Sequence, residues 1–207
     1  MPSPTTLVFD IGNVLIAWDP RNLYRKVFDD PARMEWFLSE VCDHDWNLEQ
    51  DRGRLFADAV AERIALFPDL AAEIRAYDER WPETLSGPIP GSVAILEQAR
   101  AAGVPNYAIT NFSAEKFAVA RALFPFLDGF DGIIVSAEER LVKPDPAIYR
   151  LLLDRYGLAA GACVFIDDSP KNVEGARAVG MHAVAFTAPA RLAEDLAAMG
   201  FPVGPND

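Results

Sequence analysis

The fold is decided by the stretch Leu7-Val8-Phe9-Asp10-Ile11-Gly12-Asn13-Val14-Leu15. Its apolar run is typical of a buried parallel strand. Asp10 then falls at the carboxyl end of that strand, where open α/β sheets bind their ligands. Because glycine lacks a Cβ and asparagine tolerates positive φ, we expect an unusual backbone turn at Gly12-Asn13.

Composition sets the broad class of the protein. The chain has 207 residues, 51% hydrophobic and 24% charged, which is typical of one domain with an insertion or of two small domains. The net charge of −12 argues against a nucleic-acid partner, because phosphate backbones require clustered Lys and Arg. The apolar runs are too short to span a bilayer, so we expect no membrane partner. A monomer and a homodimer both stay open.

The cysteines and the first residues indicate the compartment. Cys42 and Cys163 lie far apart and have no metal-ligand spacing. Cys163 begins an apolar run, which predicts a buried thiol. The start of the chain, Met1-Pro2-Ser3-Pro4, lacks the basic and apolar segments of a secretory signal. These features favour a reducing, cytoplasmic location.

The segment 16–88 predicts helices throughout and no strand. Its apolar residues recur at helical spacing, and Asp30-Pro31 has the form of an N-cap followed by proline. Residues 86–91 are rich in glycine and proline and predict one hinge, and the turn after Leu15 predicts the other. We therefore predict a helical cap over residues 16–88, inserted into an α/β core formed by residues 1–15 and 89–207.

Outside the cap, strands and helices alternate along the chain. Strands are predicted over residues 5–10, 106–110, 132–135, 163–166 and 182–186. Helices are predicted over 92–102, from the Ser113 cap to 123, from Asp145-Pro146 to 156, from Ser169-Pro170 to Gly180, and over 191–199. This alternation predicts right-handed βαβ units and a doubly wound parallel sheet, which is an α/β fold.

Polar groups stand at or just beyond the ends of these strands. They are Asp10, Thr110-Asn111, Lys143 and Asp167-Asp168. In a doubly wound sheet such ends converge on one crevice, where three carboxylates must protonate or find a cation. One lysine is not enough, and Mg²⁺ with oxygen ligands is the economical solution. With Thr110, Asn111 and Lys143 as phosphate partners, the constellation indicates phosphoryl transfer to an Asp nucleophile.

Four motifs in this order resemble those of the haloacid dehalogenase-like hydrolase superfamily. They are Phe9-Asp10-Ile11-Gly12-Asn13-Val14, Ile109-Thr110-Asn111, Lys143-Pro144-Asp145-Pro146 and Phe165-Ile166-Asp167-Asp168-Ser169. The resemblance covers nearly the whole chain, and the position of the helical cap also matches. The first motif looks closest to the branch that includes bacterial sugar-1-phosphate phosphatases.

The resemblance implies a role for each matching position. Asp10 would be the nucleophile that forms an aspartyl-phosphate, and Lys143 would pair with the phosphate and with Asp10. Thr110 would hydrogen-bond the phosphate, with Asn111 beside it. The implied ligands of Mg²⁺ are Asp10, the backbone carbonyl of Gly12, Asp168 and Asp167. Of the Asp pair, Asp168 would touch the metal and Asp167 would stand behind it, or the two would exchange these roles.

One position departs from the superfamily pattern. Most of its phosphatases have an acid/base Asp two positions after the nucleophile, where this chain has Gly12. General acid/base help is typically worth about 10²–10⁴-fold, so another group supplies the proton or the leaving group needs little help. A sugar 1-phosphate fits the second case, because an anomeric hydroxyl is more acidic than an ordinary alcohol. His44 fits the first case, or it is a solvated surface histidine.

Two alternative functions stay open. Haloacid dehalogenases of the superfamily also lack that Asp and use the Asp nucleophile on carbon, without metal. The pair Asp167-Asp168 argues against this, because two extra carboxylates beside an anionic substrate need a cation. The other alternative is a non-catalytic domain that binds phosphate or metal, against which the intact Asp10 and Lys143 argue.

The cap is expected to select the substrate, because it closes over the crevice. Its side chains of interest are Trp18, Arg21, Trp46, Arg52 and Trp81. Trp18 and Arg21 follow the nucleophile loop closely enough to face the site. The other two tryptophans fit either the cap interior or a sugar platform, and Arg52 fits either an exposed salt bridge or a substrate contact. In the core, Asn172 either orients Asp168 or faces solvent.

Overall fold

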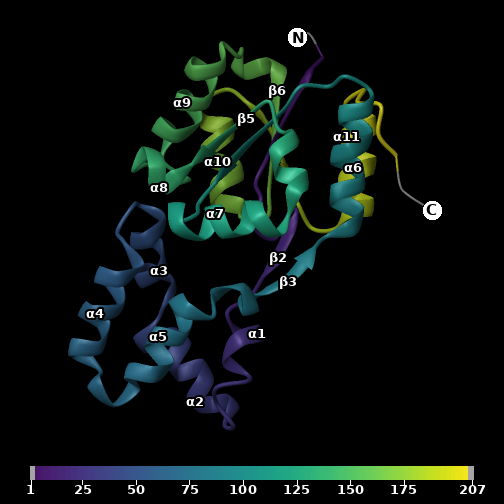
Figure 1. Ribbon diagram of the computed structural model, residues 1–207. Helices are drawn as coiled ribbons and strands as arrows, with labels where there is room; N and C mark the ends of the chain where they lie inside the picture. Colours follow the sequence, from purple (N-terminus) through teal and green to yellow (C-terminus); the bar gives the residue numbers. More distant parts are fainter. Residues whose placement is uncertain (1–2, 205–207) are drawn as a thin grey trace.

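The computed structural model describes residues 3–204, which contain a five-stranded parallel sheet (Figure 1). Its strands are β1 (Thr6–Phe9), β4 (Asn106–Thr110), β5 (Gly132–Val135), β6 (Cys163–Asp167) and β7 (His182–Ala185). Their spatial order is β5-β4-β1-β6-β7, and each neighbouring pair is parallel. Because β1 is the central strand, the residues after it lie in the middle of the carboxyl edge of the sheet.

Helices cover both faces of this sheet, which confirms the doubly wound α/β fold. The helices are α6 (Pro90–Ala101), α7 (Ala114–Leu123), α8 (Ser136–Glu139), α9 (Pro146–Tyr156), α10 (Pro170–Ala178) and α11 (Pro189–Ala198), with 3-10 helices at Pro125–Gly129 and Ala160–Ala162. In Figure 1, α6 and α11 lie on one face and α9 and α10 on the other. Leu7 and Phe9 join the buried cluster of the first face and Val8 that of the second. Burial on both faces explains why the residues from Leu7 to Phe9 of β1 are all apolar.

Local capping chemistry sets the ends of the core helices. The Asp145 carboxylate accepts a hydrogen bond from Ala147 N (2.8 Å) at the start of α9, and Gly157 ends that helix with a φ of +64°. The helices expected from positions 92 and 191 instead begin at Pro90 and Pro189. The reason is that the fixed φ of proline suits the first helical turn.

The segment 16–88 contains two short strands, so the prediction that it is helical throughout is wrong. β2 (Ile16–Trp18) pairs antiparallel with β3 (Leu85–Pro88) and joins the cap to the core (Figure 1). A strand of three residues and a strand with glycine and proline give little local signal. Their pairing joins residues that are far apart in sequence, since Ile16 pairs with Pro88 and Trp18 with Leu85.

The residues between β2 and β3 form helices that gather beyond the carboxyl edge of the sheet (Figure 1). They are α1 (Arg21–Tyr24), α2 (Pro31–Trp36), a π-helix (Phe37–Val41), α3 (His44–Asp51), α4 (Phe56–Leu66), a 3-10 helix (Pro68–Leu70), α5 (Ala71–Glu79) and a 3-10 helix (Trp81–Thr84). Aromatic rings fill their interior: centroids lie 4.8 Å apart for Tyr24 and Phe37, and 5.0 Å apart for Trp46 and Tyr77. These rings belong to the same buried cluster as the first face of the sheet, and the division into a cap and a core stays a prediction.

The two cysteines are buried and form no disulfide with each other. Cys42 and Cys163 are buried free thiols, which confirms the burial predicted for Cys163.

Among residues 3–204, no helix has both the length and the apolar character to cross a bilayer. The cytoplasmic location stays a prediction. The predicted core also includes residues 1–2 and 205–207, which lie outside the described residues.

Gly175 lies where α10 packs closely against the chain that carries Lys143. A Cβ on Gly175 would come 2.8 Å from Pro144 O and 3.0 Å from the Tyr149 ring. Overpacking outweighs the better helix propensity of alanine, so we expect Gly175→Ala to destabilise the protein by about 1–3 kcal/mol in urea unfolding. The control is Gly161→Ala, whose Cβ would meet nothing within 4 Å. Equal stability of the two variants would contradict this tight packing.

Candidate active site

The turn after β1 presents Asp10 at the carboxyl edge of the sheet. Asp10 N donates to Ile166 O (2.8 Å), and Asp10 Oδ1 accepts from Ile11 N (2.7 Å). Asn13 has a φ of +54°, as its residue type allows. Gly12 has no positive φ, and a Cβ there would meet no atom within 4 Å. Neither backbone angle nor space therefore requires glycine at position 12.

Lys143 lies between two carboxylates. Its Nζ is 2.8 Å from Asp10 Oδ1 and 2.7 Å from Asp167 Oδ2, and all three side chains are buried. Burial raises the pKa of Asp10 to about 7, against the lowering effect of Lys143, and the charge of Asp167 adds to the rise. Burial also disfavours the charge on Lys143, but the two carboxylates outweigh it and raise the pKa of Lys143 above its usual value. Each charge in this group thus depends on the others.

Asp167 and Asp168 differ in their surroundings. Asp167 is fully buried and accepts hydrogen bonds from Lys143 Nζ (2.7 Å), Ser169 N (2.8 Å) and Asn172 Nδ2 (3.0 Å). Asn172 therefore holds Asp167 and not Asp168. Asp168 is exposed and pairs with no cation in the described part of the chain, and partial burial together with the charge of Asp167 raises its pKa.

The acidic residues form a cluster that fits a divalent cation. One carboxylate oxygen from each of Asp10, Asp167 and Asp168 lies within 4.8 Å of the others. Lys143 offsets only part of their charge, so the cluster favours a further cation. Oxygen ligands at this spacing suit a hard ion such as Mg²⁺. Asp10 and Asp168 are the side chains that an ion can reach from the cavity, because the oxygens of Asp167 are occupied by protein donors.

Asn111 and Thr110 follow each other but have different surroundings. Asn111 Nδ2 donates to Lys143 O (3.1 Å), and Asn111 Oδ1 accepts from Lys143 N (2.8 Å). Asn111 thus fixes the backbone of Lys143. Thr110 is buried, its Oγ1 has no hydrogen-bond partner among residues 3–204, and its side chain does not line the cavity described next.

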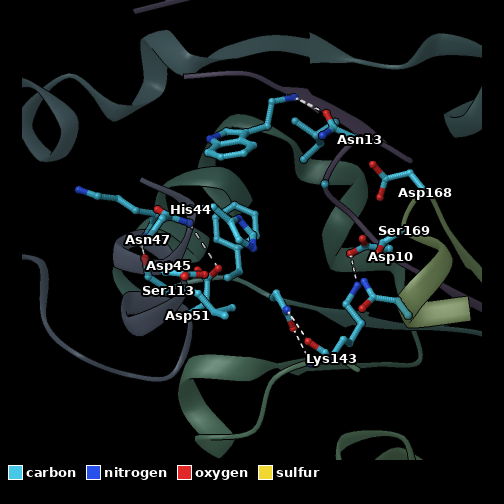
Figure 2. A pocket seen from close by; sticks show the side chains of 18 of the residues that line it. Asp10, Asn13, His44, Asp45, Asn47, Asp51, Ser113, Lys143, Asp168 and Ser169 are labelled. Atoms are coloured by element: carbon cyan, nitrogen blue, oxygen red, sulfur yellow. Dashed lines mark hydrogen bonds and ion pairs between the residues drawn. The ribbon is translucent and has the colours of Figure 1, made fainter. Parts of the chain in front are cut away.

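A cavity of about 450 Å³ lies between core and cap (Figure 2), within the range of about 300–1,000 Å³ common for small-molecule sites. Five of the predicted site residues line it: Asp10, Gly12, Asn111, Lys143 and Asp168. Figure 2 shows Asp10 and Asp168 on one side and residues of α3 on the other. The apolar residues that line the cavity are Ile16, Trp18, Leu48, Phe56, Trp81, Leu85, Phe112 and Pro144. The predicted residues Asp167 and Thr110 lie buried behind this surface.

Of the five cap side chains that the sequence analysis names, two line the cavity and three do not. Trp18 and Trp81 line the cavity. Trp46 packs edge-on against a tyrosine in the cap interior. Arg21 and Arg52 do not line the cavity and form surface ion pairs with glutamates, each at 2.6 Å.

Asp51, the last residue of α3, is a site residue that was not predicted from the sequence. It lines the cavity, and burial raises the pKa of its carboxyl to about 7. In the sequence it precedes Arg52-Gly53 and has the form of a polar helix end, and Gly53 indeed has a φ of +100°. Only the docking of this helix end onto the core shows that the carboxyl faces a site. His44, at the other end of α3, also lines the cavity.

The site has an Asp at the end of the central parallel strand, paired with a lysine and flanked by further carboxylates, which is the arrangement expected of a hydrolase with an Asp nucleophile. The model of the haloacid dehalogenase-like hydrolase family matches residues 4–180, and the chain belongs to this family. The resemblance noted in the four motifs is thereby confirmed.

Relatives of the chain include phosphatases. A sesquiterpene phosphatase of Aspergillus oryzae is 28% identical over 84% of this chain and 85% of its own length. A phosphatase of Mycobacterium tuberculosis is 30% identical over 87% of this chain and 86% of its own length.

Solved structures share the fold at low sequence identity. A family enzyme of Bacteroides thetaiotaomicron in a magnesium complex superposes with a TM-score of 0.71 at 19% identity, over 90% of this chain and 95% of its own. An L-2-haloacid dehalogenase of Xanthobacter autotrophicus gives a TM-score of 0.63 at 19% identity, over 96% and 84%. At this identity the two neighbours bear on the fold alone.

Proposed function

We propose that the protein is a cytoplasmic, Mg²⁺-dependent phosphatase that hydrolyses a small phosphorylated metabolite through an aspartyl-phosphate on Asp10. The observation that carries this proposal is the cluster of three carboxylates within 4.8 Å beside the Asp10–Lys143 pair. Such a cluster favours a bound cation, and a cation beside an anionic substrate favours phosphoryl transfer. The phosphatases among the relatives support the same reaction class.

The side chains around Asp10 have distinct tasks in this reaction. Lys143 holds a phosphoryl oxygen next to the attacking carboxylate, and Asn111 keeps Lys143 in place through two backbone bonds. The unpartnered hydroxyl of Thr110 is a donor for the phosphate if the substrate reaches it. Asp10, Asp168 and the Gly12 carbonyl would hold Mg²⁺, which offsets the negative charge of nucleophile and phosphate when bound.

Two substrate classes fit the cavity. A sugar 1-phosphate fits the absence of an acid/base Asp at Gly12, because its leaving oxygen is comparatively acidic. The apolar lining, which includes Trp18, Phe56 and Trp81, favours instead an alcohol phosphate with an apolar chain. The sesquiterpene phosphatase relative supports this second class.

Phosphate release from a panel of anomeric sugar, hexitol, nucleotide and prenyl phosphates tests the function. Each ester is assayed with Mg²⁺ and with EDTA, and we expect release in Mg²⁺ and a loss of at least about 10²-fold in EDTA. Preference for anomeric esters would support a sugar 1-phosphate, whereas alkyl esters cleaved as fast would exclude that class. Halide release from 2-haloacids in EDTA, with no ester cleaved, would establish the dehalogenase alternative. Silence in both assays would favour a binding domain.

A further inference from the structure

The cavity contains a carboxyl group that the proposed reaction has not yet used. We propose that Asp51 of the cap is the group that gives a proton to the leaving oxygen and later takes one from water. This inference rests on the proposed phosphatase function and assigns the acid/base role that Gly12 cannot fill. In Figure 2, Asp51 lies across the cavity from Asp10 and Asp168, which is the side where a leaving group opposite Asp10 would lie.

The backbone of Asp51 is anchored to the core. Ser136 Oγ donates to Asp51 O (2.6 Å) and accepts from Phe112 N (2.9 Å). Ser136 is fully buried and follows β5, so one hydroxyl ties the end of α3 to the carboxyl edge of the sheet. Close to Ser136 in sequence, Ala137 also contacts the chain after α3, because a Cβ on Gly53 would come 2.9 Å from Ala137 O. The cap therefore holds Asp51 over the cavity by close backbone contact.

The carboxyl of Asp51 is held by neutral donors. Asn47 Nδ2 lies 3.4 Å from Asp51 Oδ2, and the Tyr77 hydroxyl donates to Asn47 Oδ1 (3.1 Å). A hydrogen bond from the backbone of Ser113 favours the charged form, as does Lys143, although Asp51 forms no ion pair among residues 3–204. Burial outweighs both and raises its pKa to about 7. A carboxyl of this kind exchanges a proton readily near neutral pH.

The chemistry balances with Asp51 alone as the proton carrier. Asp10 attacks phosphorus, the bond from phosphorus to the leaving oxygen breaks, and that oxygen takes its electron pair and the proton of Asp51. The alcohol then leaves. Asp51, now a carboxylate, takes a proton from a water molecule as the water oxygen attacks the aspartyl-phosphate. Inorganic phosphate leaves, Asp10 is again a carboxylate and Asp51 is again protonated.

Other titratable groups face the same space. The charge of Lys143 in the core lowers the pKa of Asp51, and the charge of Asp51 in turn raises the pKa of Tyr77 of α5. The cavity also exposes Asp10, Asp168, His44, Asp45, Lys116 and Lys171. His44 is the rival proton carrier, because it lines the cavity from the first turn of α3. Lys116 is engaged by the Asp78 carboxylate and backbone of α5.

Two esters of similar shape test the proposal in the presence of Mg²⁺. The leaving group of p-nitrophenyl phosphate, p-nitrophenolate, is a stabilised anion that can leave without a proton. The leaving group of phenyl phosphate, phenolate, is more basic and depends more strongly on a proton donor. We expect Asp51→Asn to lower kcat/KM for phenyl phosphate by about 10²-fold or more, and for the nitrophenyl ester by less than about 10-fold. Glu49→Gln, the same carboxyl-to-amide replacement on α3 outside the cavity, should match wild type on both esters.

The pH profile tests the same point in the wild-type protein without any substitution. Protonated Asp51 disappears as the pH rises past about 7, so kcat/KM for phenyl phosphate should fall there. The nitrophenyl ester should show little of this fall, and Asp51→Asn should remove it.

Thermal melting gives a readout that does not depend on activity. The pKa of Asp51 is about 7 in the folded state against an ordinary value of 3.8, so the folded state binds the proton more tightly. Through this one group, rising pH between these values lowers the stability of wild type relative to Asp51→Asn. The melting temperature of the variant minus that of wild type should therefore grow from pH 4 to pH 7 and then stay constant. An advantage independent of pH would show that Asp51 is ionised throughout and would overturn its role as donor.

The kinetic outcomes separate the proposals from each other. Equal losses on both esters in Asp51→Asn would reduce Asp51 to a structural residue. If kcat/KM for phenyl phosphate falls much more than that for the nitrophenyl ester in His44→Gln, and not in Asp51→Asn, the proton donor is His44. Wild-type protein inactive on every phosphate ester would overturn the proposed function itself, and this inference with it.

Discussion

Asp10→Asn is expected to lower the phosphatase kcat by at least about 10⁴-fold, the order of magnitude typical for loss of a catalytic nucleophile. An amide cannot attack phosphorus as a carboxylate does, so no covalent intermediate forms. The substitution keeps size and shape, and the amide oxygen can still accept a hydrogen bond from Ile11 N, as the carboxylate of Asp10 does at 2.7 Å. The measurement is phosphate release in Mg²⁺ from the best ester of the panel.

Covalent trapping distinguishes this explanation from a general loss of binding. Acid quenching of wild-type protein during turnover should add the mass of one phosphoryl group to the peptide that contains Asp10, and Asp10→Asn should show no such adduct. Both proteins should melt within a few degrees of each other, because the fold around β1 is intact. Residual activity above a few per cent of wild type, free of contaminating phosphatase, would contradict the aspartyl-phosphate route.

The parts of the fold that the sequence predicts are those where local pattern and tertiary packing agree. β1 is recognisable because burial on both faces leaves only apolar residues from Leu7 to Phe9. α9 is recognisable because Asp145 and Gly157 act as its caps. The ribbon of β2 and β3 is not, because its stability comes from pairing two segments at opposite ends of the cap rather than from either segment alone.

Some residues of the candidate site can likewise be predicted from the sequence, whereas Asp51 cannot. Asp10, Lys143 and Asp168 are recognisable because the carboxyl ends of parallel strands meet at one edge. Asp51 reaches that edge only through the docking of the cap, by contacts of Ser136 and Gly53 that no sequence period encodes. If Asp51 carries the proton, the cap contributes chemistry to the reaction as well as selecting the substrate.

Lys143→Met is expected to destabilise the protein by about 3–5 kcal/mol. The substitution keeps the length of the side chain but leaves the buried carboxylates of Asp10 and Asp167, 2.8 and 2.7 Å from Lys143 Nζ, without their cation. Urea unfolding in EDTA measures the loss. The control Lys26→Met removes an exposed ion pair with Glu83 (2.9 Å), and exposed pairs contribute about 0–1 kcal/mol.

Mg²⁺ should restore part of the stability that Lys143→Met loses. A cation held by Asp10 and Asp168 offsets the charge that Lys143 no longer offsets, so the increase in stability from EDTA to Mg²⁺ should be larger in Lys143→Met than in wild type or in Lys26→Met. Activity should stay low even in Mg²⁺, because the phosphoryl oxygen has lost its lysine partner. An equal effect of Mg²⁺ on all three proteins would contradict a metal site at this cluster, since an ion bound elsewhere would not respond to the charge of Lys143.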